Sequence, residues 1–425
     1  MKTQQSKKFN PNYAAQIVTL KKSVKHPNAD RLIIWTIQGC NVITDNVNYS
    51  EGDEVVFFPL ESQINKDLIG FLSLYREKDL NKNKNNSGFF EQSCRIKALK
   101  LRAVPSEGFI IKVSSLNEFL MDKIGEKLDY QIGDVFDSCG DIQICKKYII
   151  RELRVNNGQK KEKIVVDLGL VENQFRLHYD TEKLATNEYI LSPGDICVIG
   201  NKVHGTSLVS SKLLVKKKLS LKDKIAKFFG VKVQETEYDY IYSSRKVIKS
   251  VGENKKDGQH FYKEDVWGLA HDRIKHALKD GMSLYCEIVG YLPSGGMIQK
   301  DYDYGCKEGE FKVFVYRITT TNSSGDVFEW DWASIKNHCE SHEIDHVPEY
   351  YYGPVNFTLA QLKEKYLEKD CEICNNKVPA EGICFRNESR SKKAFKLKSF
   401  TFLERETKSL DKGDVDIESQ ESLGE

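Results

Sequence analysis

The sequence predicts an α+β protein of two domains, a small N-terminal β-barrel followed by a larger domain of mixed strands and helices. Up to about residue 130, short apolar or alternating runs are separated by turn signals, which is typical of an all-β module. From about residue 150, strand-like runs alternate with helical ones, which is typical of an α+β domain. A chain of 425 residues is long enough to bury both cores.

The N-terminal domain is expected over residues 1–130. Its five predicted strands are 17–20, 32–37, 55–60, 94–101 and 108–113. Pro27, Gly52 and Pro105 mark turns between these runs. Five short strands with such turns fit a small barrel.

A basic stretch lies in the fourth of these predicted strands. On a regular strand Arg95 and Lys97 share one face, and Lys100 and Arg102 share the other, unless a bulge brings all four together. Four cations on one surface would suit the phosphates of a nucleic acid. An ordinary solvated strand is the alternative.

The chain between the two domains is expected to form a connecting helix and then a linker at 131–150. Leu116, Phe119 and Leu120 recur at helical spacing.

The second domain is expected over 151–404. Its strand-like runs are 164–170, 196–199, 285–291, 311–319, 382–385 and 394–402, and its helical runs are 266–280 and 359–367. The acidic end, 405–425, predicts a disordered tail.

The stretch K-V-H-G-T-S at 202–207 is the most informative part of the second domain. It follows a β-branched run that stops at Gly200, so Lys202 is expected at the end of a buried strand, with Gly205 letting the backbone approach a ligand. A lysine among other cations or beside a metal ion has a lowered pKa and can act as a nucleophile. A surface lysine beside a turn is the alternative.

Five more short motifs follow in order. They are Y-S-S-R at 242–245, Y-C-E-I-V-G at 285–290, V-F-V-Y-R-I at 313–318, A-E-G-I-C-F at 380–385 and F-K-L-K at 395–398. Each is weak alone, but their order resembles the motif series of the covalent nucleotidyltransferases, the superfamily of ATP-dependent ligases and capping enzymes. K-x-H-G-T in place of K-x-D-G is similar to the RNA ligases. The resemblance implies an adenylation domain with the ATP-grasp-like fold of DNA and RNA ligases.

The order of the domains extends this resemblance. H-P-N-A-D-R-L at 26–32 resembles the signature of OB-fold tRNA-binding modules of some aminoacyl-tRNA synthetases, so the N-terminal barrel is expected to be OB-like. An OB-like module placed before a K-x-H-G-T domain resembles the fifth, Deinococcus-type family of RNA ligases. G-D-E-V-V-F-F at 52–58, the basic strand and H-Y-D-T-E at 178–182 are similar to that family as well, so the resemblance covers residues 14–402.

The resemblance implies an ATP-dependent RNA ligase that joins RNA 3′-OH and 5′-phosphate ends, with free ends or a nicked duplex as its partner. Lys202 would attack the α-phosphate of ATP, AMP would pass to the 5′-phosphate, and the 3′-OH would displace AMP. Lys396 and Lys398 point the same way on an alternating strand, and would contact the α-phosphate and depress the pKa of Lys202. A solvated strand edge is the alternative for these two lysines. Glu381 would bind Mg²⁺ or Mn²⁺, because such ions take oxygen ligands.

Six further motif residues are expected to bind the ATP cofactor. They are His204, Gly205, Thr206, Arg245, Glu287 and Tyr316. By the resemblance, Arg245 would lie on the ribose or the phosphates and Glu287 would accept hydrogen bonds from the ribose hydroxyls. Tyr316 would stack on adenine, with an ordinary core tyrosine as the alternative.

Three features depart from the family pattern. Ser207 stands where asparagine often closes the first motif, and Arg317 stands where many relatives have an aspartate. Arg245 lies 43 residues after Lys202 because of a lysine-rich insertion at 212–238. The insertion predicts a helix whose apolar stripe consists of Leu221, Ile225, Phe228 and Phe229. It is either a basic helix lying along substrate RNA or a solvated helix packed by its apolar face.

Composition adds little to the choice of partner, because the net charge is only +2. No run reaches membrane-spanning length and the start lacks the apolar segment of a signal peptide, so we expect a cytoplasmic monomer with no membrane partner. Eleven cysteines, several of them within apolar strands, favour reduced thiols. C-E-I-C at 371–374 and the nearby His338, His342 and His346 leave a structural zinc site as an alternative.

Two other functions compete with an RNA ligase. DNA ligase or capping-type activity is disfavoured by K-V-H-G-T-S and by the N-terminal barrel. A non-catalytic RNA-binding protein with a decayed transferase domain would require a lost motif residue, whereas Lys202, Glu287, Glu381, Lys396 and Lys398 are all present. Because every motif lies after residue 150, a fragment that starts there is expected to form the lysyl-AMP by itself.

Overall fold

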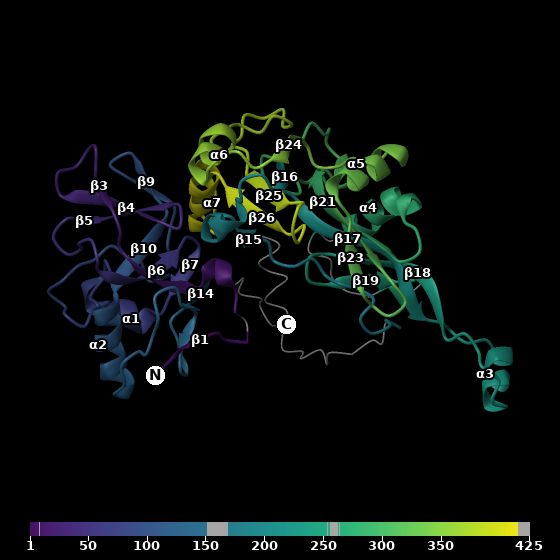
Figure 1. The fold of residues 1–425 in the computed structure, drawn as a ribbon, viewed down its shortest axis with the longest axis horizontal. Helices are drawn as coiled ribbons and strands as arrows, with labels where there is room; N and C mark the ends of the chain where they lie inside the picture. Colours follow the sequence, from purple (N-terminus) through teal and green to yellow (C-terminus); the bar gives the residue numbers. More distant parts are fainter. Residues whose placement is uncertain (8, 151–168, 253, 256–261, 263, 415–425) are drawn as a thin grey trace.

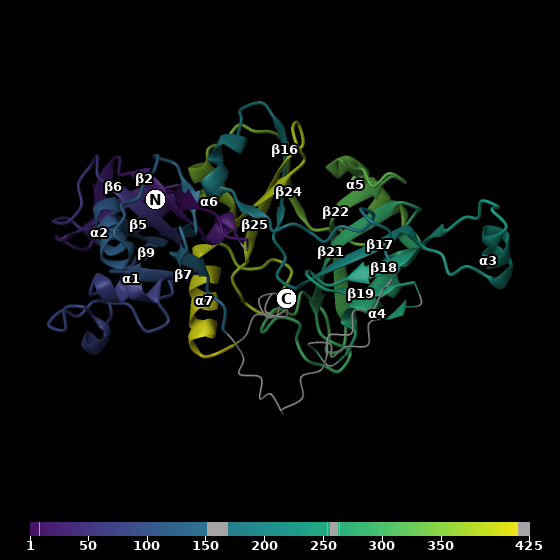
Figure 2. The same cartoon turned by 90° about the horizontal axis from the view of Figure 1, so that it is seen from below.

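The computed structural model describes residues 1–7, 9–150, 169–252, 254–255, 262 and 264–414. Figures 1 and 2 show three bodies in a row: the N-terminal domain, a five-stranded sheet and a seven-stranded sheet. Most of the strand predicted at 164–170, and the last part of the predicted tail, lie outside the described residues.

The N-terminal domain is built from small antiparallel sheets and two helices. Its largest sheet has the order β10 (Gly108–Lys112), β6 (Glu54–Pro59), β2 (Ala15–Thr19) and β11 (Val135–Phe136). A second sheet contains β3 (Ser23–Lys25), β4 (Leu32–Ile37) and β5 (Cys40–Asp45). Shorter pairings join β7 (Ser62–Ile64) to β14 (Cys145–Lys147), β8 (Leu99–Leu101) to β9 (Val104–Ser106), and β12 (Ser138–Cys139) to both β1 (Thr3–Gln4) and β13 (Ile142–Gln143).

Alternation along these strands places apolar side chains on both faces of the largest sheet. On one face Phe57 and Ile110 pack with Trp35 of the three-stranded sheet. On the other face the core includes Phe119 from α2 (Val113–Ile124) and Leu68 from α1 (Lys66–Phe71). The strand pairings among the described residues join several small sheets rather than one closed ring, so the closed OB-like barrel stays a prediction.

Two expectations for this region are wrong. Residues 131–150 do not form a linker, because β11 and β14 in this range pair with β2 and β7 of the N-terminal sheets. The strand predicted at 94–101 is limited to β8, Leu99–Leu101, because Cys94 has a positive φ of 51° and only an isolated bridge joins Arg95 to Gln63.

The second domain contains two sheets side by side. The five-stranded sheet has the order β15 (Glu182–Lys183), β26 (Ala394–Lys398), β25 (Gly382–Asn387), β16 (Ile196–Asn201) and β24 (Glu349–Pro354). The seven-stranded sheet is antiparallel, with the order β20 (Asn254–Lys255), β19 (Ile248–Val251), β18 (Thr236–Ser243), β17 (Thr206–Lys216), β21 (Met282–Gly290), β22 (Phe311–Thr321) and β23 (Val327–Glu329). The predicted α+β class is confirmed.

Helices cover one face of each sheet. Against the seven-stranded sheet, Trp267 of α4 (Val266–Ile274) and Ile335 of α5 (Trp332–Ser341) are fully buried. Against the five-stranded sheet, Leu362 of α6 (Leu359–Tyr366) packs with Phe385. A further helix, α3 (Leu221–Phe228), lies in the insertion between β17 and β18.

The last helix, α7 (Phe400–Asp411), joins the two domains. Its Phe400 packs in the core of the N-terminal domain, whereas its Phe402 packs in the core of the seven-stranded sheet. The strand predicted at 394–402 therefore ends at Lys398, where Ser399 caps the helix by accepting a hydrogen bond from the backbone of Phe402. The tail predicted from residue 405 is helical as far as Asp411.

The basic strand of the N-terminal domain faces this helix. Arg95 is buried, and its Nη2 donates to the carbonyl of Thr407 and to Oδ1 of Asp411, both at 3.0 Å. Lys97 pairs with Asp411 at 2.9 Å, and Lys100 approaches Glu404 at 3.9 Å. The expected cationic surface for nucleic acid is therefore wrong for Arg95 and Lys97, which Asp411 of α7 neutralises, whereas the side chain of Lys100 is 46% exposed.

Candidate active site

Lys202 lies where the chain passes from one sheet to the other. It directly follows β16 of the five-stranded sheet, and β17 of the seven-stranded sheet begins four residues later at Thr206. The backbone N–H of Lys202 donates to the carbonyl of Gly382 at 3.0 Å, which anchors it beside β25. The predicted position of this lysine at a strand end is confirmed.

Gly205 packs too closely against β21 for any other residue. A Cβ at this position would lie 2.1 Å from the carbonyl oxygen of Ile288. Gln299 donates through Nε2 to the Gly205 carbonyl at 2.8 Å, and Thr206 is buried next to it. The glycine thus serves close packing of the loop against the sheet, whereas the sequence suggested close approach to a ligand.

Glu287 holds the loop from the neighbouring strand β21. Its Oε1 accepts the backbone N–H of Gly205 at 3.1 Å, and its Oε2 accepts the hydroxyl of Ser207 at 3.4 Å. Ser207 therefore has a defined contact in place of the asparagine of the family pattern. The backbone N–H of His204 donates to the hydroxyl of Tyr304 at 2.6 Å.

A buried carboxylate lies between two lysines of the motif series. Glu381, the residue before β25, is 4% exposed, and its Oε1 lies 2.7 Å from Nζ of Lys202 and 3.6 Å from Nζ of Lys398. Its Oε2 lies 3.6 Å from Nδ1 of His204 and, among the described residues, is a buried oxygen with no hydrogen-bond partner. The structure thus brings together side chains from the first, fifth and sixth motifs.

The pKa of Lys202 differs in direction from the prediction. Burial is the largest single effect and opposes its charge, but Glu381, together with Cys384 and Glu287, raises the pKa of Lys202 above its usual value. Lys398 lowers it, as expected, but only in part. Burial also acts against the charge of Glu381, and there the two lysines prevail and lower the pKa of the carboxyl. The pair is therefore held in its ionised form.

Lys396 and Lys398 alternate on β26 with the buried Phe395 and Leu397, so the two lysines share one face, as predicted. Burial, followed by the charges of Lys398 and Lys202, lowers the pKa of Lys396 to about 7. No carboxylate lies within ion-pair distance of Lys396 in the part of the chain that the structure describes.

Lys398 also pairs with carboxylates from distant parts of the chain. Glu406 of α7 lies 3.2 Å from its Nζ, and Glu61 of the N-terminal domain lies 3.7 Å away. These carboxylates raise the pKa of Lys398 well above its usual value, although burial opposes this. Sequence reasoning missed both, since Glu61 sits in a turn with no motif and Glu406 falls in the predicted tail.

Two of the predicted nucleotide-binding residues contact the stretch 178–182, and one of them, Arg245, is close enough to Lys396 for its charge to help lower the pKa of that lysine. Arg245 pairs with Asp180 at 2.8 Å, and Asp180 also accepts a hydrogen bond from Asn10 of the N-terminal domain. Tyr316, on β22, meets the ring of His178 edge-on at 5.2 Å. The stretch 178–182, which the sequence singled out, therefore contributes a contact to each of them.

Arg317, which departs from the family pattern, is bound within the protein. Its Nε donates to Glu329 at 2.9 Å, and its guanidinium lies 4.1 Å from the ring centroid of Tyr285. Because Arg317 is held by β21 and β23, the departure is accommodated by local pairing.

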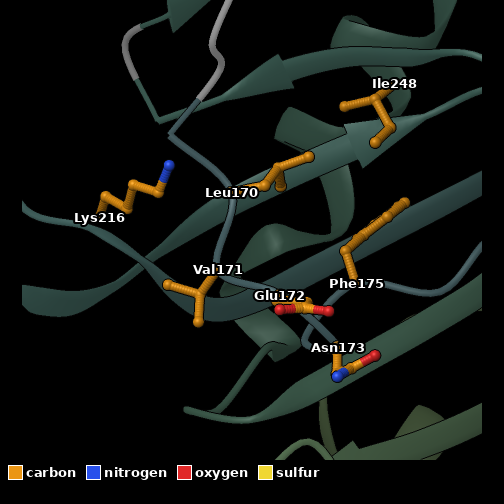
Figure 3. A pocket seen from close by; sticks show the side chains of 7 residues that line it. All are labelled: Leu170, Val171, Glu172, Asn173, Phe175, Lys216 and Ile248. Carbon is orange, nitrogen blue, oxygen red and sulfur yellow. The ribbon is translucent and has the colours of Figure 1, made fainter.

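Cavities of about 460 Å³ lie at two places among the described residues. The one in Figure 3, lined by residues such as Leu170, Phe175 and Ile248, contains no predicted site residue. The other lies between the domains and is lined by Lys100, Lys363 and Lys398 among others, so it reaches the lysine cluster from the N-terminal side.

The zinc alternative receives no support. Within the described ranges, no three side chains of histidine, cysteine, aspartate or glutamate gather as metal ligands. Cys371 and Cys374 are free, as are the other cysteines of the described chain.

A helix that could span a lipid bilayer is lacking among the described residues.

A half-buried lysine held by a carboxylate and flanked by further lysines, at the junction of two sheets of an α+β fold, is an arrangement suited to nucleophilic group transfer. Comparison with family models makes the assignment more specific, because residues 195–398 match the model described as RNA ligase. These residues form an RNA ligase domain, and the protein is an enzyme of this kind. No curated protein sequence matches the chain.

Solved structures of an RNA ligase from Naegleria gruberi share the fold. A lysine-to-alanine variant with ATP and Mn aligns with a TM-score of 0.58 and 16% identity, covering 92% of this chain and 98% of that chain. A glutamate-to-alanine variant with ATP and Mn gives 0.60 and 15% over the same shares. The enzyme with PPi gives 0.58 and 14%, covering 93% of this chain and 98% of the other. The similarity of fold extends over both domains.

Proposed function

We propose that this protein is an ATP-dependent RNA ligase that seals RNA 3′-OH and 5′-phosphate ends through a lysyl-AMP at Lys202 and an adenylylated 5′ end, and that it acts in RNA repair. The observation that carries the proposal is the contact of Lys202 with the buried Glu381 beside Lys398, within the RNA ligase domain. The Deinococcus-type family and the OB-like N-terminal barrel belong to the same proposal.

The first step forms a bond between Nζ of Lys202 and the α-phosphorus of ATP and breaks the bond to pyrophosphate. Negative charge accumulates on phosphate oxygens during this step, so nearby cations stabilise it. Lys396 and Lys398 would supply that charge from one face of β26. Because Lys396 has a pKa of about 7, it can take up a proton as the triphosphate arrives.

Glu381 fits a divalent cation. Its Oε2 is a buried carboxylate oxygen without a hydrogen-bond partner, and carboxylate oxygen is the ligand type that Mg²⁺ and Mn²⁺ prefer. His204 Nδ1 lies 3.6 Å from this oxygen, but no three ligand side chains gather in the described chain, so water and phosphate oxygens would complete the shell. A bound ion would supply positive charge that competes with Lys202 for Glu381 and so favours the neutral amine. The N. gruberi structures with ATP and Mn support this choice of cofactors.

The other motif residues would bind the nucleotide. Glu287, already hydrogen-bonded to the loop of Lys202, would receive the ribose hydroxyls, with His204, Gly205 and Thr206 forming the floor beneath. Arg245 and Tyr316 would contact the phosphates or ribose and the adenine, respectively.

Incubation with radiolabelled ATP or GTP in the presence of magnesium tests the proposal. We expect label from ATP on the wild-type protein and none on Lys202→Ala. Lys212→Ala is a matched control, because Lys212 lies in the next strand, pairs with Asp280 at 2.8 Å and is similarly shielded. Labelling of Lys202→Ala would refute the mechanism, and labelling by GTP alone would indicate a capping-type enzyme.

Sealing of nicked duplexes tests the substrate. Two nicked duplexes share the same template and the same 5′-phosphate strand. They differ only in whether the strand that ends in the 3′-OH is RNA or DNA. We expect faster sealing from the RNA 3′ end. Equal use of a DNA 3′ end would remove RNA specificity from the proposal, and adduct without any sealing would indicate a decayed ligase.

A further inference from the structure

The insertion between β17 and β18 forms an arm, which we define as residues 217–235. The two strands pair as far as Lys216 and Thr236, and the backbone N–H of Lys217 donates to the carbonyl of Glu235 at 2.8 Å. Helix α3 lies at the tip, and in both Figure 1 and Figure 2 it stands apart from the rest of the molecule.

The apolar stripe of α3 is exposed. The exposed fractions are 76% for Leu221, 52% for Ile225, 85% for Phe228 and 75% for Phe229. No residue of α3 is buried. One of the two expectations for the insertion, a helix packed by its apolar face, is therefore wrong, and this face is available to another molecule.

The arm also concentrates positive charge. Six lysines, one aspartate and one glutamate lie in residues 217–235, so the arm has a net charge of +4, whereas the whole chain has +2, and Lys227 pairs with Glu235 at 2.7 Å. The single aspartate, Asp223, accepts hydrogen bonds from the backbone and hydroxyl of Ser220 and caps the helix. At 3.6 residues per turn, Lys222 and Lys224 flank the apolar stripe on its two sides.

A ligand that matches this surface must offer both negative charge and flat apolar faces. Unpaired nucleotides do so, because each has a phosphate and an exposed base that can stack on an aromatic ring. A duplex offers phosphates, but its bases are stacked inside and would leave Phe228 and Phe229 in water. Charge complementarity and the exposed rings therefore favour single-stranded RNA over duplex RNA.

We propose that the arm binds unpaired nucleotides of the RNA substrate at a distance from the ends that are joined. This inference rests on the proposed function for its substrate. β17 runs from Thr206, beside the lysine cluster, to Lys216 at the base of the arm, and a strand of that length spans about 30 Å. The arm thus selects RNAs that carry a loop or single-stranded extension remote from the nick.

Equilibrium binding without ATP tests the proposal, with two nicked RNA duplexes that differ only in a single-stranded extension starting about ten base pairs from the nick. We expect the wild-type protein to bind the extended RNA about tenfold more tightly, and Phe228→Ser/Phe229→Ser to lose that preference. Phe328→Ser is the matched control, because Phe328 is 57% exposed on the edge strand β23. Equal affinity for both RNAs, or an unchanged preference in the double variant, overturns the proposal.

Two further measurements distinguish RNA binding by the arm from a failed ligase mechanism and from lipid binding. Label transfer from ATP to Lys202 is expected to be the same in the wild-type protein and the arm variant, since no residue of α3 is buried and β17 separates the arm from the lysine cluster. If neither protein is labelled while the RNA preference is present, the proposed function fails and the arm's RNA binding stands. Vesicles of phosphatidylcholine and phosphatidylglycerol provide the second measurement. If binding to these vesicles requires Phe228 whereas binding to RNA does not, the apolar surface is assigned to lipid.

Discussion

The lysines around Lys202 and the lysines of the arm carry the same charge in opposite surroundings. Lys202 and Lys398 are largely shielded from water and each faces Glu381, so burial and carboxylates together set their pKa values. Of the arm lysines, Lys222, Lys224 and Lys227 lie on α3, a helix with no buried residue. The fold sets the electrostatic surroundings of the first group, whereas the solvent and its salt set those of the second group.

The basic strand lies between these extremes. Arg95 and Lys97 looked in sequence like the arm, as cations available to a polyanion, but α7 supplies Asp411 to both. The comparison teaches that a run of basic residues is a binding surface only where no acidic segment of the same chain covers it. Substitutions in each group measure how strongly it depends on its surroundings.

The largest effect is expected from Glu381→Gln. This change removes the charge between Lys202 and Lys398 and the oxygen anion proposed to hold the metal, so the rate of lysyl-AMP formation should fall about 100-fold or more. The rate is measured with labelled ATP over a magnesium series. Glu349→Gln is the control, because this carboxylate pairs with Lys336 at 2.7 Å on the other edge of the sheet. A normal rate for Glu381→Gln at ordinary magnesium would refute its assignment.

Lys396→Met should stabilise the protein in a pH-dependent way. Burial and then the charges of Lys398 and Lys202 lower the pKa of Lys396 to about 7, while the unfolded chain keeps the ordinary lysine value. Between those values the unfolded state holds a proton that the folded state has released, so the wild-type free energy of unfolding rises with pH.

The gain from Lys396→Met should therefore be largest at and below about pH 7, on the order of 1–3 kcal/mol, and shrink as the pH rises from there toward the ordinary lysine value. Urea unfolding at several pH values measures it. A gain that is the same at every pH would show that the charge of Lys396 is not suppressed in the folded state.

Arg95→Ala should destabilise the protein by about 2 kcal/mol, because the carbonyl of Thr407 and the carboxylate of Asp411 lose a buried donor. Urea unfolding gives the change, and hydrogen exchange should show α7 opening first. Unchanged protection of α7 would contradict the role of Arg95 as its anchor.

The smallest effect on stability is expected from Lys217→Ala/Lys218→Ala in the arm, within about 0.5 kcal/mol of wild type. The same variant should reduce the salt dependence of binding to RNA with a single-stranded extension by about 0.7 in the logarithmic slope per lysine. A salt series of equilibrium binding measures this. An unaltered slope would mean that these lysines do not meet phosphates.

Separate action of the two domains is no longer expected. The sequence suggested that a fragment starting near residue 150 would form the adduct alone. In the structure Phe400 of α7 packs in the N-terminal core and Glu61 of that domain faces Lys398, so such a fragment would expose an apolar helix and lose a counter-charge of the site. Its adduct formation would be impaired as well as its sealing.

The sequence by itself determined the parts of the site that depend on local pattern. Lys202 lies at a strand end because a β-branched run stops there, and Lys396 and Lys398 share a face because strands alternate with period two. The α+β class followed from the same periodicities. These features involve neighbours in the chain, so no knowledge of distant segments was needed.

Only the tertiary structure decided which charges meet. Glu61, Glu381 and Glu406 come from three separate regions and converge on Lys398, and the pKa of Lys202 rises because Glu381 reaches it from a distant part of the chain. The same holds for α7, which buries Arg95, and for the apolar stripe of α3, which is exposed instead of packed. Electrostatic energies depend on distance and burial in space, and neither can be read from the order of residues.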